Sequence, residues 1–314
     1  MSHALSSVPM QAFEDGIHAI DTLYLRPGLD ASHLIVETGR AAFVDTGVAS
    51  SVPLLLSALE TLGIARARVE LIFLTHVHLD HAGGAGLLAA QLPNARVVVH
   101  PRGLRHMADP SRLIAGSVAV HGEARFQALY GQILPIAPQR LVSGEDGMRI
   151  ALGEREFELI HTPGHAAHHF CILDARAGAV FSGDTFGVSY RALDTERGAF
   201  IFPTTTPVQF DPEALHASID RLMSHAPRAM FLTHYSRVAD TARLAADLHA
   251  DIEAFVALVH AAQGAALRAR MFDYLEGRAR HHGVTLSSAE LHALLDMDVD
   301  LNAQGLEHWL QHPR

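Results

Sequence analysis

Cysteine is almost missing from this 314-residue sequence, which contains only Cys171. A single cysteine forbids an intrachain disulfide and removes every cysteine-rich zinc motif. Any metal ion held by the chain must therefore be bound by histidine and carboxylate side chains. The same scarcity is typical of a reducing compartment, and we expect a cytoplasmic protein.

Long apolar runs and an excess of positive charge are missing as well. No stretch approaches the roughly 20 apolar residues that cross a bilayer, and residues 1–16 lack the basic start and apolar core of a signal peptide. The formal net charge is −10, and lysine is absent. Because nucleic-acid binding needs a surplus of basic groups, we expect a small-molecule substrate, with no nucleic-acid and no membrane partner. A homodimer stays open.

The pattern of apolar and turn residues predicts two sets of β-strands with helices between and after them. Strands are expected at 17–25, 33–38, 41–47, 69–75 and 95–100, and again at 148–152, 157–162, 168–174, 179–185 and 229–234. Helices are expected at 53–63, 86–93 and 211–225, and from about 239 to the end, where Ser288 and 290–295 open a last amphipathic segment.

This order predicts an α/β fold, an αββα sandwich of two mixed β-sheets flanked by helices. Residues 1–238 would form the sandwich, and residues 239–314 a C-terminal helical extension packed on it.

Histidine is the enriched residue, with 23 copies, and its densest cluster follows the apolar strand expected at 69–75. The segment Thr75-His-Val-His-Leu-Asp-His81 holds three histidines and an aspartate, and Gly83-Gly84 follows. A loop between a strand and a helix can direct such side chains to one point, where imidazole and carboxylate groups bind a divalent metal. The alternative is a solvated polar loop.

This H-x-H-x-D-H segment, together with motifs further along the chain, resembles the metallo-β-lactamase superfamily over residues 17–237. The later motifs are Thr-Pro-Gly-His165, Ser-Gly-Asp184-Thr and Leu-Thr-His234, each at the end of an expected strand. The resemblance implies a first metal held by His76, His78 and His165, a second held by Asp80, His81 and His234, and Asp184 as a bridge between them.

Each later motif also has an ordinary structural explanation. His165 would suit a loop, Asp184 a turn, and His234 a hydrogen-bonded position in the core. The occurrence of all four motifs in the family's order favours the metal site. Asp45, in Phe-Val-Asp-Thr-Gly, also matches a family position and is expected to orient the histidine loop; the alternative is a turn carboxylate.

A two-metal site of this kind would carry out hydrolysis. Two metal ions can share one water and lower its pKa toward neutrality, so that a bridging hydroxide attacks the substrate. Asp80 could orient that hydroxide or carry its proton to the leaving group, and Asp80 and Asp184 are therefore the predicted catalytic carboxylates. Zinc is the first expectation for the two divalent ions, with iron and manganese as alternatives.

The spacing of the motifs narrows the substrate class. Asp184 and His234 are 50 positions apart, too close for the extra domain of the superfamily's nucleic-acid-processing branch. The helical tail resembles the glyoxalase II and acyl-thioester hydrolase branches, so a small ester, thioester or amide is expected. The same ligands loaded with iron would also suit a persulfide dioxygenase or another redox member, and a silent binding protein is the third alternative.

Several residues beside the ligands are candidates for substrate contact. Tyr190, Arg191 and Tyr235 adjoin ligand motifs, although exposed surface positions would explain them equally well. His168 and His169 could donate an extra metal ligand, but they are expected to begin the next strand, with one facing away. The other, with His168 as the candidate, would face the pocket and bond a substrate or a ligand. His161 is expected to be structural. The loop 200–207 would form a lid or pocket wall, or else a turn packed against the tail.

Overall fold

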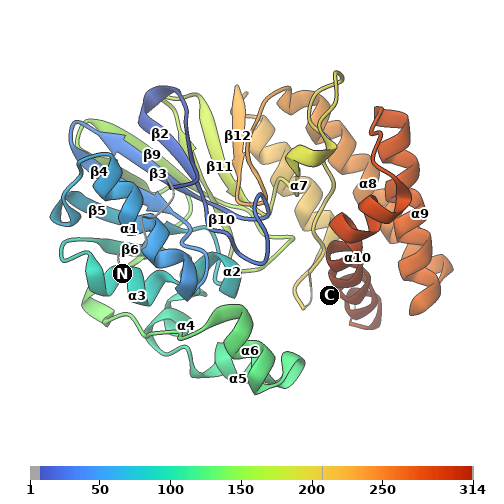
Figure 1. The fold of residues 1–314 in the computed structure, drawn as a ribbon, viewed down its shortest axis with the longest axis horizontal. Coiled ribbons are helices and arrows are strands. Elements are labelled where there is room, and N and C mark those ends of the chain that lie inside the picture. Colours follow the sequence, from blue (N-terminus) through green and yellow to red (C-terminus); the bar gives the residue numbers. More distant parts are fainter. Residues whose placement is uncertain (1–7, 207, 313–314) are drawn as a thin grey trace, which may run out of the picture.

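The computed structural model describes residues 8–206 and 208–312. Two earlier expectations fall partly outside these ranges. Residues 1–7 belong to the segment expected to lack a signal peptide, and Pro207 belongs to the expected lid. Two β-sheets lie face to face and helices flank them, as Figure 1 shows. The predicted αββα sandwich is confirmed.

The first sheet has seven strands, which lie side by side in chain order. They are β1 (Met10–Ala12), β2 (Ile17–Asp21), β3 (Ala31–Glu37), β4 (Arg40–Val44), β5 (Val69–Leu74), β6 (Arg96–Val99) and β7 (Leu141–Ser143). Pairing is antiparallel up to β4 and parallel from β4 to β7. The carboxyl ends of the parallel strands therefore lie at one edge.

The second sheet has six strands in the order β13-β12-β11-β10-β9-β8. They are β8 (Arg149–Leu152), β9 (Arg155–His161), β10 (Phe170–Asp174), β11 (Ala179–Gly183), β12 (Ala229–Leu232) and β13 (Ser236–Val238). The pair β11 and β12 is parallel, and the other pairs are antiparallel. This sheet is mixed too.

Ten α-helices in the described part of the chain surround the two sheets. They are α1 (Val52–Thr61), α2 (Leu79–Ala82), α3 (Ala85–Gln91), α4 (Leu104–Ala108), α5 (Ser111–His121), α6 (Glu123–Tyr130), α7 (Pro212–Met223), α8 (Thr241–Ala261), α9 (Ala265–His282) and α10 (Ser288–Gln311). Figure 1 shows α1 and α3 against the first sheet, and α7 to α10 on the side of the second sheet.

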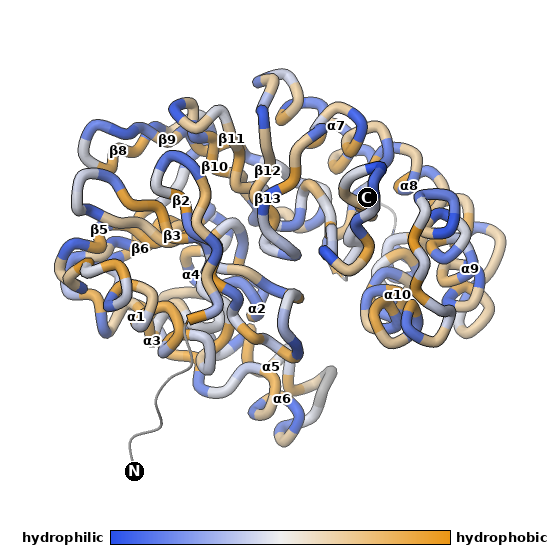
Figure 2. Tube along the Cα trace, turned by 45° about the horizontal axis from the view of Figure 1, so that its top comes forward, coloured by the Kyte–Doolittle hydropathy of each residue, from blue (hydrophilic) through white to orange (hydrophobic). Residues whose placement is uncertain are grey.

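Apolar side chains of the two sheets meet in a shared core. Phe73 and Phe157 contact each other edge to face across it, with ring centroids 5.6 Å apart. Figure 2 shows hydrophobic colour along strands such as β6 and β10 and hydrophilic colour at the turns that join strands. A second core is continuous from Val180 of the second sheet to Leu295 and Leu306 of α10. The C-terminal helices thus pack on the sandwich, while the domain boundary at residue 238 stays a prediction.

The strand expected at 17–25 is shorter than predicted. It ends at Asp21, whose carboxylate accepts hydrogen bonds from the backbone N–H groups of Leu23 and Gly28 at 2.9 and 2.8 Å. Leu23 and Leu25 both have positive φ angles, and their side chains are exposed. The side-chain bonds of Asp21 stabilise a turn, which local apolar character did not reveal. The resulting loop, residues 22–30, borders the site described below.

Two helix starts follow from capping chemistry. Asp211 accepts a hydrogen bond from the N–H of Ala214 at 3.0 Å, and Pro212 occupies the first position of α7, as expected. The last helix begins after Ser287, which forms a capping box with Glu290. The expected opening of this helix at Ser288 is confirmed. No helix in the described part of the chain is long and apolar enough to cross a membrane.

Candidate metal centre

The histidine motif lies in the connection between β5 and α2. After β5 ends at Leu74, the chain turns through His76 and His78, and α2 then carries Asp80 and His81 on its first turn. His76 and His81 are fully buried. A strand end followed at once by a short helix brings all four side chains to one edge of the first sheet.

The remaining three candidates come from the second sheet. His165 follows β9, Asp184 follows β11 directly, and His234 follows β12. Gly183 has a φ of 47°, and a Cβ there would lie 2.6 Å from the hydroxyl oxygen of Thr75. A residue with a side chain would therefore separate Asp184 from the histidine loop.

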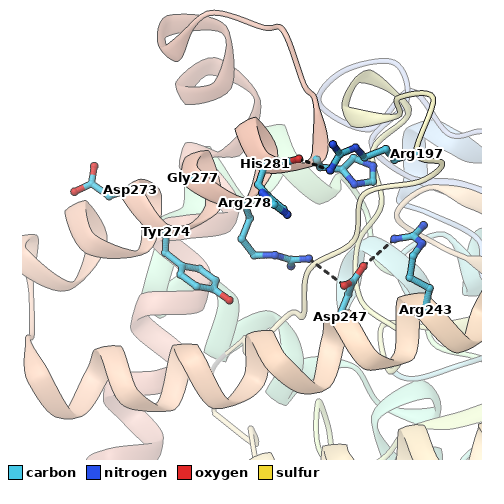
Figure 3. Close-up of a pocket in the computed structure, with 9 residues that line it drawn as sticks. Arg197, Arg243, Asp247, Asp273, Tyr274, Gly277, Arg278 and His281 are labelled. Carbon is cyan, nitrogen blue, oxygen red and sulfur yellow. Dashed lines mark hydrogen bonds and ion pairs between the residues drawn. The ribbon is translucent and has the colours of Figure 1, made fainter.

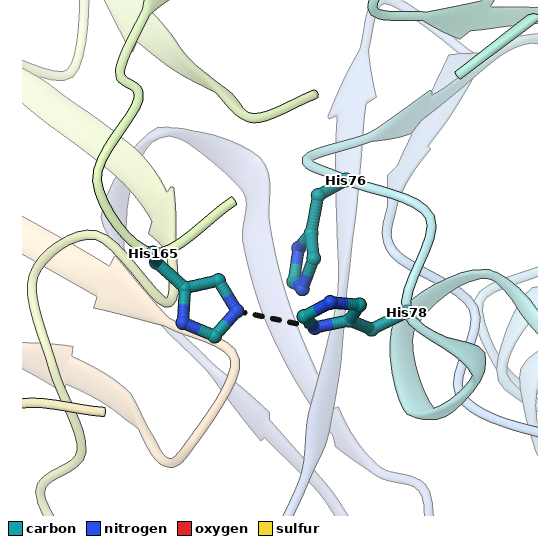
Figure 4. A group of neighbouring side chains, drawn as sticks. All are labelled: His76, His78 and His165. Carbon is teal, nitrogen blue, oxygen red and sulfur yellow. Dashed lines mark hydrogen bonds between the residues drawn. The ribbon is translucent and has the colours of Figure 1, made fainter. Parts of the chain in front are cut away.

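The structure brings all seven side chains together in three overlapping groups. Within each group the ligand atoms lie within 4.8 Å of one another. The groups are His76, His78 and His165; Asp80, His81 and His234; and His76, His81 and Asp184. Figure 4 shows the three rings of the first group pointing toward one another.

Asp184 contacts both sets of three ligands. One carboxylate oxygen, Oδ1, lies 3.2 Å from Nε2 of His81 and 3.7 Å from Nε2 of His234. The other, Oδ2, lies 3.4 Å from Nε2 of His165. This is the position that a carboxylate shared by two metal ions would occupy.

Three buried ligand atoms have no hydrogen-bond partner among the described residues. They are Nε2 of His76, Nε2 of His81 and Oδ1 of Asp184, and they belong to one group. Leaving buried polar atoms unsatisfied costs free energy, so a native structure normally supplies a partner. Metal ions would supply it here, and five imidazoles with two carboxylates suit zinc, iron or manganese.

Hydrogen bonds on the far side of the rings fix their orientation. Nδ1 of His81 lies 2.8 Å from a carboxylate oxygen of Asp45. Nδ1 of His234 donates to the carbonyl of Leu29 at 2.9 Å, and Nδ1 of His165 donates to the carbonyl of Thr204 at 3.3 Å. Each bond sets the tautomer that leaves Nε2 with a lone pair for a metal ion.

The electrostatics of the metal-free centre also fit cation binding. Burial and the neighbouring imidazoles hold the pKa values of His76 and His78 well below the usual range, so both rings are neutral ligands at pH 7. Burial alone would lower the pKa of His234, but Asp184 and Asp80 outweigh it and raise the pKa to about 10. The carboxylates thus require a cationic partner, and metal binding would displace the proton.

His168 and His169 do not behave as predicted. Strand β10 begins only at Phe170, so both histidines lie in the turn before it and do not alternate between two faces. The ring of His169 stacks on His76 at 4.9 Å, and its Nδ1 lies 2.8 Å from the hydroxyl of Thr162. The ring of His168 lies 6.2 Å from His76. Both therefore adjoin the ligand cluster.

The three other candidates for substrate contact lie close to His234 in the chain or in space. Tyr190 is buried, and its hydroxyl donates to Asp298 of α10 at 3.0 Å. Arg191 donates to the carbonyl and hydroxyl of Ser189 at 2.8 and 2.6 Å. Tyr235 is half-buried and follows His234 directly. Their roles toward a substrate stay predictions.

The loop after residue 199 is part of the core and not a lid. Phe200, Ile201 and Phe202 are buried, and Phe202 pairs with Val188. Thr205 donates its backbone N–H to the side chain of Asn302 at 2.6 Å. The loop therefore packs against the tail, which was the alternative considered for it. The carbonyl of Thr204 also contacts His165, and a role of the loop as a pocket wall stays a prediction. His161 donates to the carbonyl of Gly144 at 2.8 Å, in agreement with a structural role.

Sequence reasoning missed the residues that support the centre from a distance. No sequence motif marked these residues, which are the carbonyl of Leu29, the side chains of Asp298 and Asn302, and the loop 22–30. A backbone carbonyl leaves no trace in residue identity, and α10 lies far from the ligands along the chain. No local signal could have found them.

A cleft of about 540 Å³ lies elsewhere, between α8, α9 and the turn at Arg197, and Figure 3 shows its lining. It contains none of the ligand candidates. Arg243 pairs with Asp247 at 2.8 Å, and Arg278 lies 3.5 Å from the same carboxylate. Asp247 thus pairs with two of the arginines that line the cleft.

The fold is an αββα sandwich of two mixed sheets with flanking helices. At the strand ends it holds a centre of histidines and carboxylates, which is the arrangement of a metalloprotein. A family model described as the metallo-beta-lactamase superfamily matches residues 25–234. The chain belongs to this superfamily, as the motifs predicted.

Relatives and solved structures agree with this assignment. The hydroxyacylglutathione hydrolase of Acidiphilium cryptum (strain JF-5) is 29% identical over 236 residues, which cover 75% of this chain and 75% of that protein. The acyl-coenzyme A thioesterase MBLAC2 of Gallus gallus is 31% identical over 121 residues, 38% of this chain and 43% of the relative. The structure of ST1585 from Sulfolobus tokodaii matches with a TM-score of 0.63 at 21% identity, covering 93% of this chain and 98% of that one.

Proposed function

We propose that this chain is a metal-dependent hydrolase with two divalent ions, acting on a small thioester or a related ester or amide. The observation that carries the proposal is the set of three buried ligand atoms without a hydrogen bond, from His76, His81 and Asp184, at one point. The names of two relatives, a hydroxyacylglutathione hydrolase and an acyl-coenzyme A thioesterase, support an acyl substrate.

The ligands divide between the two ions. His76, His78 and His165 would hold one ion, Asp80, His81 and His234 the other, and Asp184 would contact both. When bound, the ions supply a water acidic enough to act as a nucleophile at neutral pH and a Lewis acid for the substrate carbonyl. Zinc is the metal we expect, with iron or manganese as alternatives.

Asp80 is the ligand suited to carry a proton. Its side chain is 29% exposed, whereas that of Asp184 is 5% exposed and that of His81 is fully buried. Burial alone would raise the pKa of Asp80, but His81 and His234 lower it below its usual value, so the group is a carboxylate at neutral pH. Its accessible position allows it to take a proton from the nucleophilic water and pass it to the leaving group. Such a proton would matter most for an amide or ester leaving group and least for a thiolate.

Metal analysis and a substrate screen test this function. Protein purified without added metal should contain two ions per chain and should hydrolyse at least one thioester or ester. His76→Ala and Asp184→Ala should lose turnover and metal while the protein stays folded by circular dichroism. His225→Ala, which changes an exposed histidine, is the matched control.

Two results would contradict the proposal. Undiminished rates in His76→Ala or Asp184→Ala would show that the ligand assignment is wrong. About one iron per chain, with oxygen consumed in the presence of a persulfide, would identify a dioxygenase instead.

A further inference from the structure

Arg26 lies in the loop 22–30, which forms part of the surroundings of the metal centre. The carbonyl of Leu29, three positions further on, accepts the Nδ1 hydrogen bond of the ligand His234 at 2.9 Å. Thr22 closes the loop by donating to the carboxylate of Asp30 at 3.0 Å. The backbone that carries Arg26 is therefore fixed to one of the proposed ligands.

The guanidinium of Arg26 has no hydrogen bond and no ion pair with any described residue. Its Nη2 atom is nevertheless buried. Its guanidinium carbon lies 4.4 Å from the ring centre of Tyr190, and its charge interacts with the carboxylate of Asp298 without a hydrogen bond. A stack on an aromatic ring satisfies the flat face of an arginine but none of its five N–H donors. Such a group has its donors available for an anion.

Tyr190 is a rigid platform for this arginine. Its side chain is 2% exposed, and its hydroxyl donates to the carboxylate of Asp298 at 3.0 and 3.1 Å. The residue before it, Ser189, donates its backbone N–H to the carbonyl of His234 at 2.7 Å. Arg26 and Tyr190 are thus both tied to His234, by two separate backbone contacts.

The surroundings favour a carboxylate over a phosphate. A planar guanidinium matches the two oxygens of a carboxylate, and a single arginine supplies one positive charge. The carboxylate of Asp298 lies at the hydroxyl end of the same tyrosine and would repel a doubly charged phosphate more strongly than a singly charged carboxylate. The chain also has no lysine to add positive charge.

We propose that Arg26, stacked on Tyr190, binds a carboxylate group of the substrate beside the metal centre. This inference rests on the proposed hydrolase function and names its substrate class: acyl compounds that carry a carboxylate. The carboxylate belongs either to the acyl group or to the leaving thiol. Arg26 then acts as the specificity residue, through its charge and its paired donors.

Matched thioesters test the inference and distinguish the two sources of the carboxylate. Glutaryl and pentanoyl thioesters of N-acetylcysteamine differ by a carboxylate on the acyl group. Pentanoyl thioesters of 3-mercaptopropionate and of N-acetylcysteamine differ by a carboxylate on the thiol. The wild type should prefer the charged member of one pair. Arg26→Gln should lower that preference, as a ratio of kcat/KM values, by about 10- to 100-fold, the range for a hydrogen bond to a charged group.

A binding measurement separates failure of this inference from failure of the proposed function. Calorimetric titration of the metal-loaded protein with glutarate should show binding that weakens by about 10-fold or more in Arg26→Gln. Arg149→Gln, which changes an exposed arginine on β8, should keep both the ratio and the affinity.

The outcomes are distinct. If no thioester or ester is cleaved but glutarate binding depends on Arg26, the hydrolase proposal fails and the anion site stands. If thioesters are cleaved and Arg26→Gln changes neither the ratio nor glutarate binding, Arg26 is not a carboxylate site.

Discussion

A carboxylate oxygen of Asp45 lies 2.8 Å from Nδ1 of His81, and both residues are fully buried. The same carboxylate accepts hydrogen bonds from the backbone N–H of Thr75 and the hydroxyl of Thr233, each at 2.8 Å. Asp45 thus contacts the predicted ligand His81. It also contacts Thr75 and Thr233, which directly precede the predicted ligands His76 and His234. One side chain holds together the ligand loops of both sheets.

Asp45→Asn should weaken metal binding without unfolding the protein. An amide cannot accept all of these bonds at once, and a neutral partner no longer strengthens His81 as a ligand. Loss of a group that orients a metal ligand typically costs about 10- to 100-fold in metal affinity. Competition with a fluorescent chelator measures the effect. Wild-type affinity for both ions would show that Asp45 only closes a turn.

His168→Ala should lower activity while both metal ions stay bound. Its Nδ1 is buried without a partner among the described residues, and its ring lies 5.7 Å from that of His78. Burial, together with His165 and His106, lowers the pKa of His168 to about 4, so the ring is neutral at pH 7 and can donate to a substrate. Loss of one such bond should reduce kcat/KM by about 10-fold. Metal content per chain checks the assignment, since loss of an ion would make His168 a ligand.

Asn302→Leu should destabilise the protein and weaken its binding of the metal ion that His165 is predicted to hold. Asn302 is 2% exposed and accepts the backbone N–H of Thr205 at 2.6 Å, while its own amide donates to the carbonyl of Pro203 at 3.2 Å. Leucine leaves these buried groups unpaired, at a cost of about 1–3 kcal/mol. Thr204 lies between Pro203 and Thr205, and its carbonyl accepts a hydrogen bond from His165.

Urea unfolding and metal titration measure these two effects. Gln304→Leu, at an exposed position of the same helix, is the control. If Asn302→Leu lowers stability but leaves metal affinity at the wild-type value, α10 does not position His165.

The clustering of the seven candidate ligands could be predicted from sequence because each lies in a short motif at or after the end of a strand. His76 follows β5 of the first sheet and His234 follows β12 of the second, and the two side chains converge because the sheets lie face to face with these strand ends at the same edge. The motif order added what the single residues could not: His165 or Asp184 alone would have suited an ordinary turn. Strand periodicity is a local feature, and together with the order of the elements along the chain it was sufficient to predict the sandwich.

The features that the sequence did not predict depend on exact element ends or on distant contacts. His168 and His169 were assigned to a strand that begins only at Phe170, because Gly164 and its turn extend further than the apolar pattern indicates. Arg26 lay directly after the expected strand 17–25, which the side chain of Asp21 ends early. Its stack on Tyr190, and the bond from Tyr190 to Asp298 of α10, need the tertiary fold.

His33 should make the protein less stable in acid, and His33→Leu should remove that sensitivity. His33 lies on β3, 1% exposed, with its ring 5.5 and 5.4 Å from those of Phe181 and Phe231. Burial lowers its pKa to about 4, and the nearby Asp45 only partly offsets this. The unfolded chain, with a histidine pKa of about 6.5, therefore binds the proton more tightly than the native state.

The stability that His33 contributes is accordingly present above about pH 6.5 and is lost as the pH falls toward 4. Between pH 7 and pH 5, the wild type should lose about 2 kcal/mol more of its free energy of unfolding than His33→Leu. Urea unfolding in the presence of a chelator measures this, because metal release then contributes to neither curve. His225→Leu, an exposed histidine, should lose as much as the wild type. Parallel pH profiles for the wild type and His33→Leu would show that His33 is protonated as readily in the native state as in the unfolded chain.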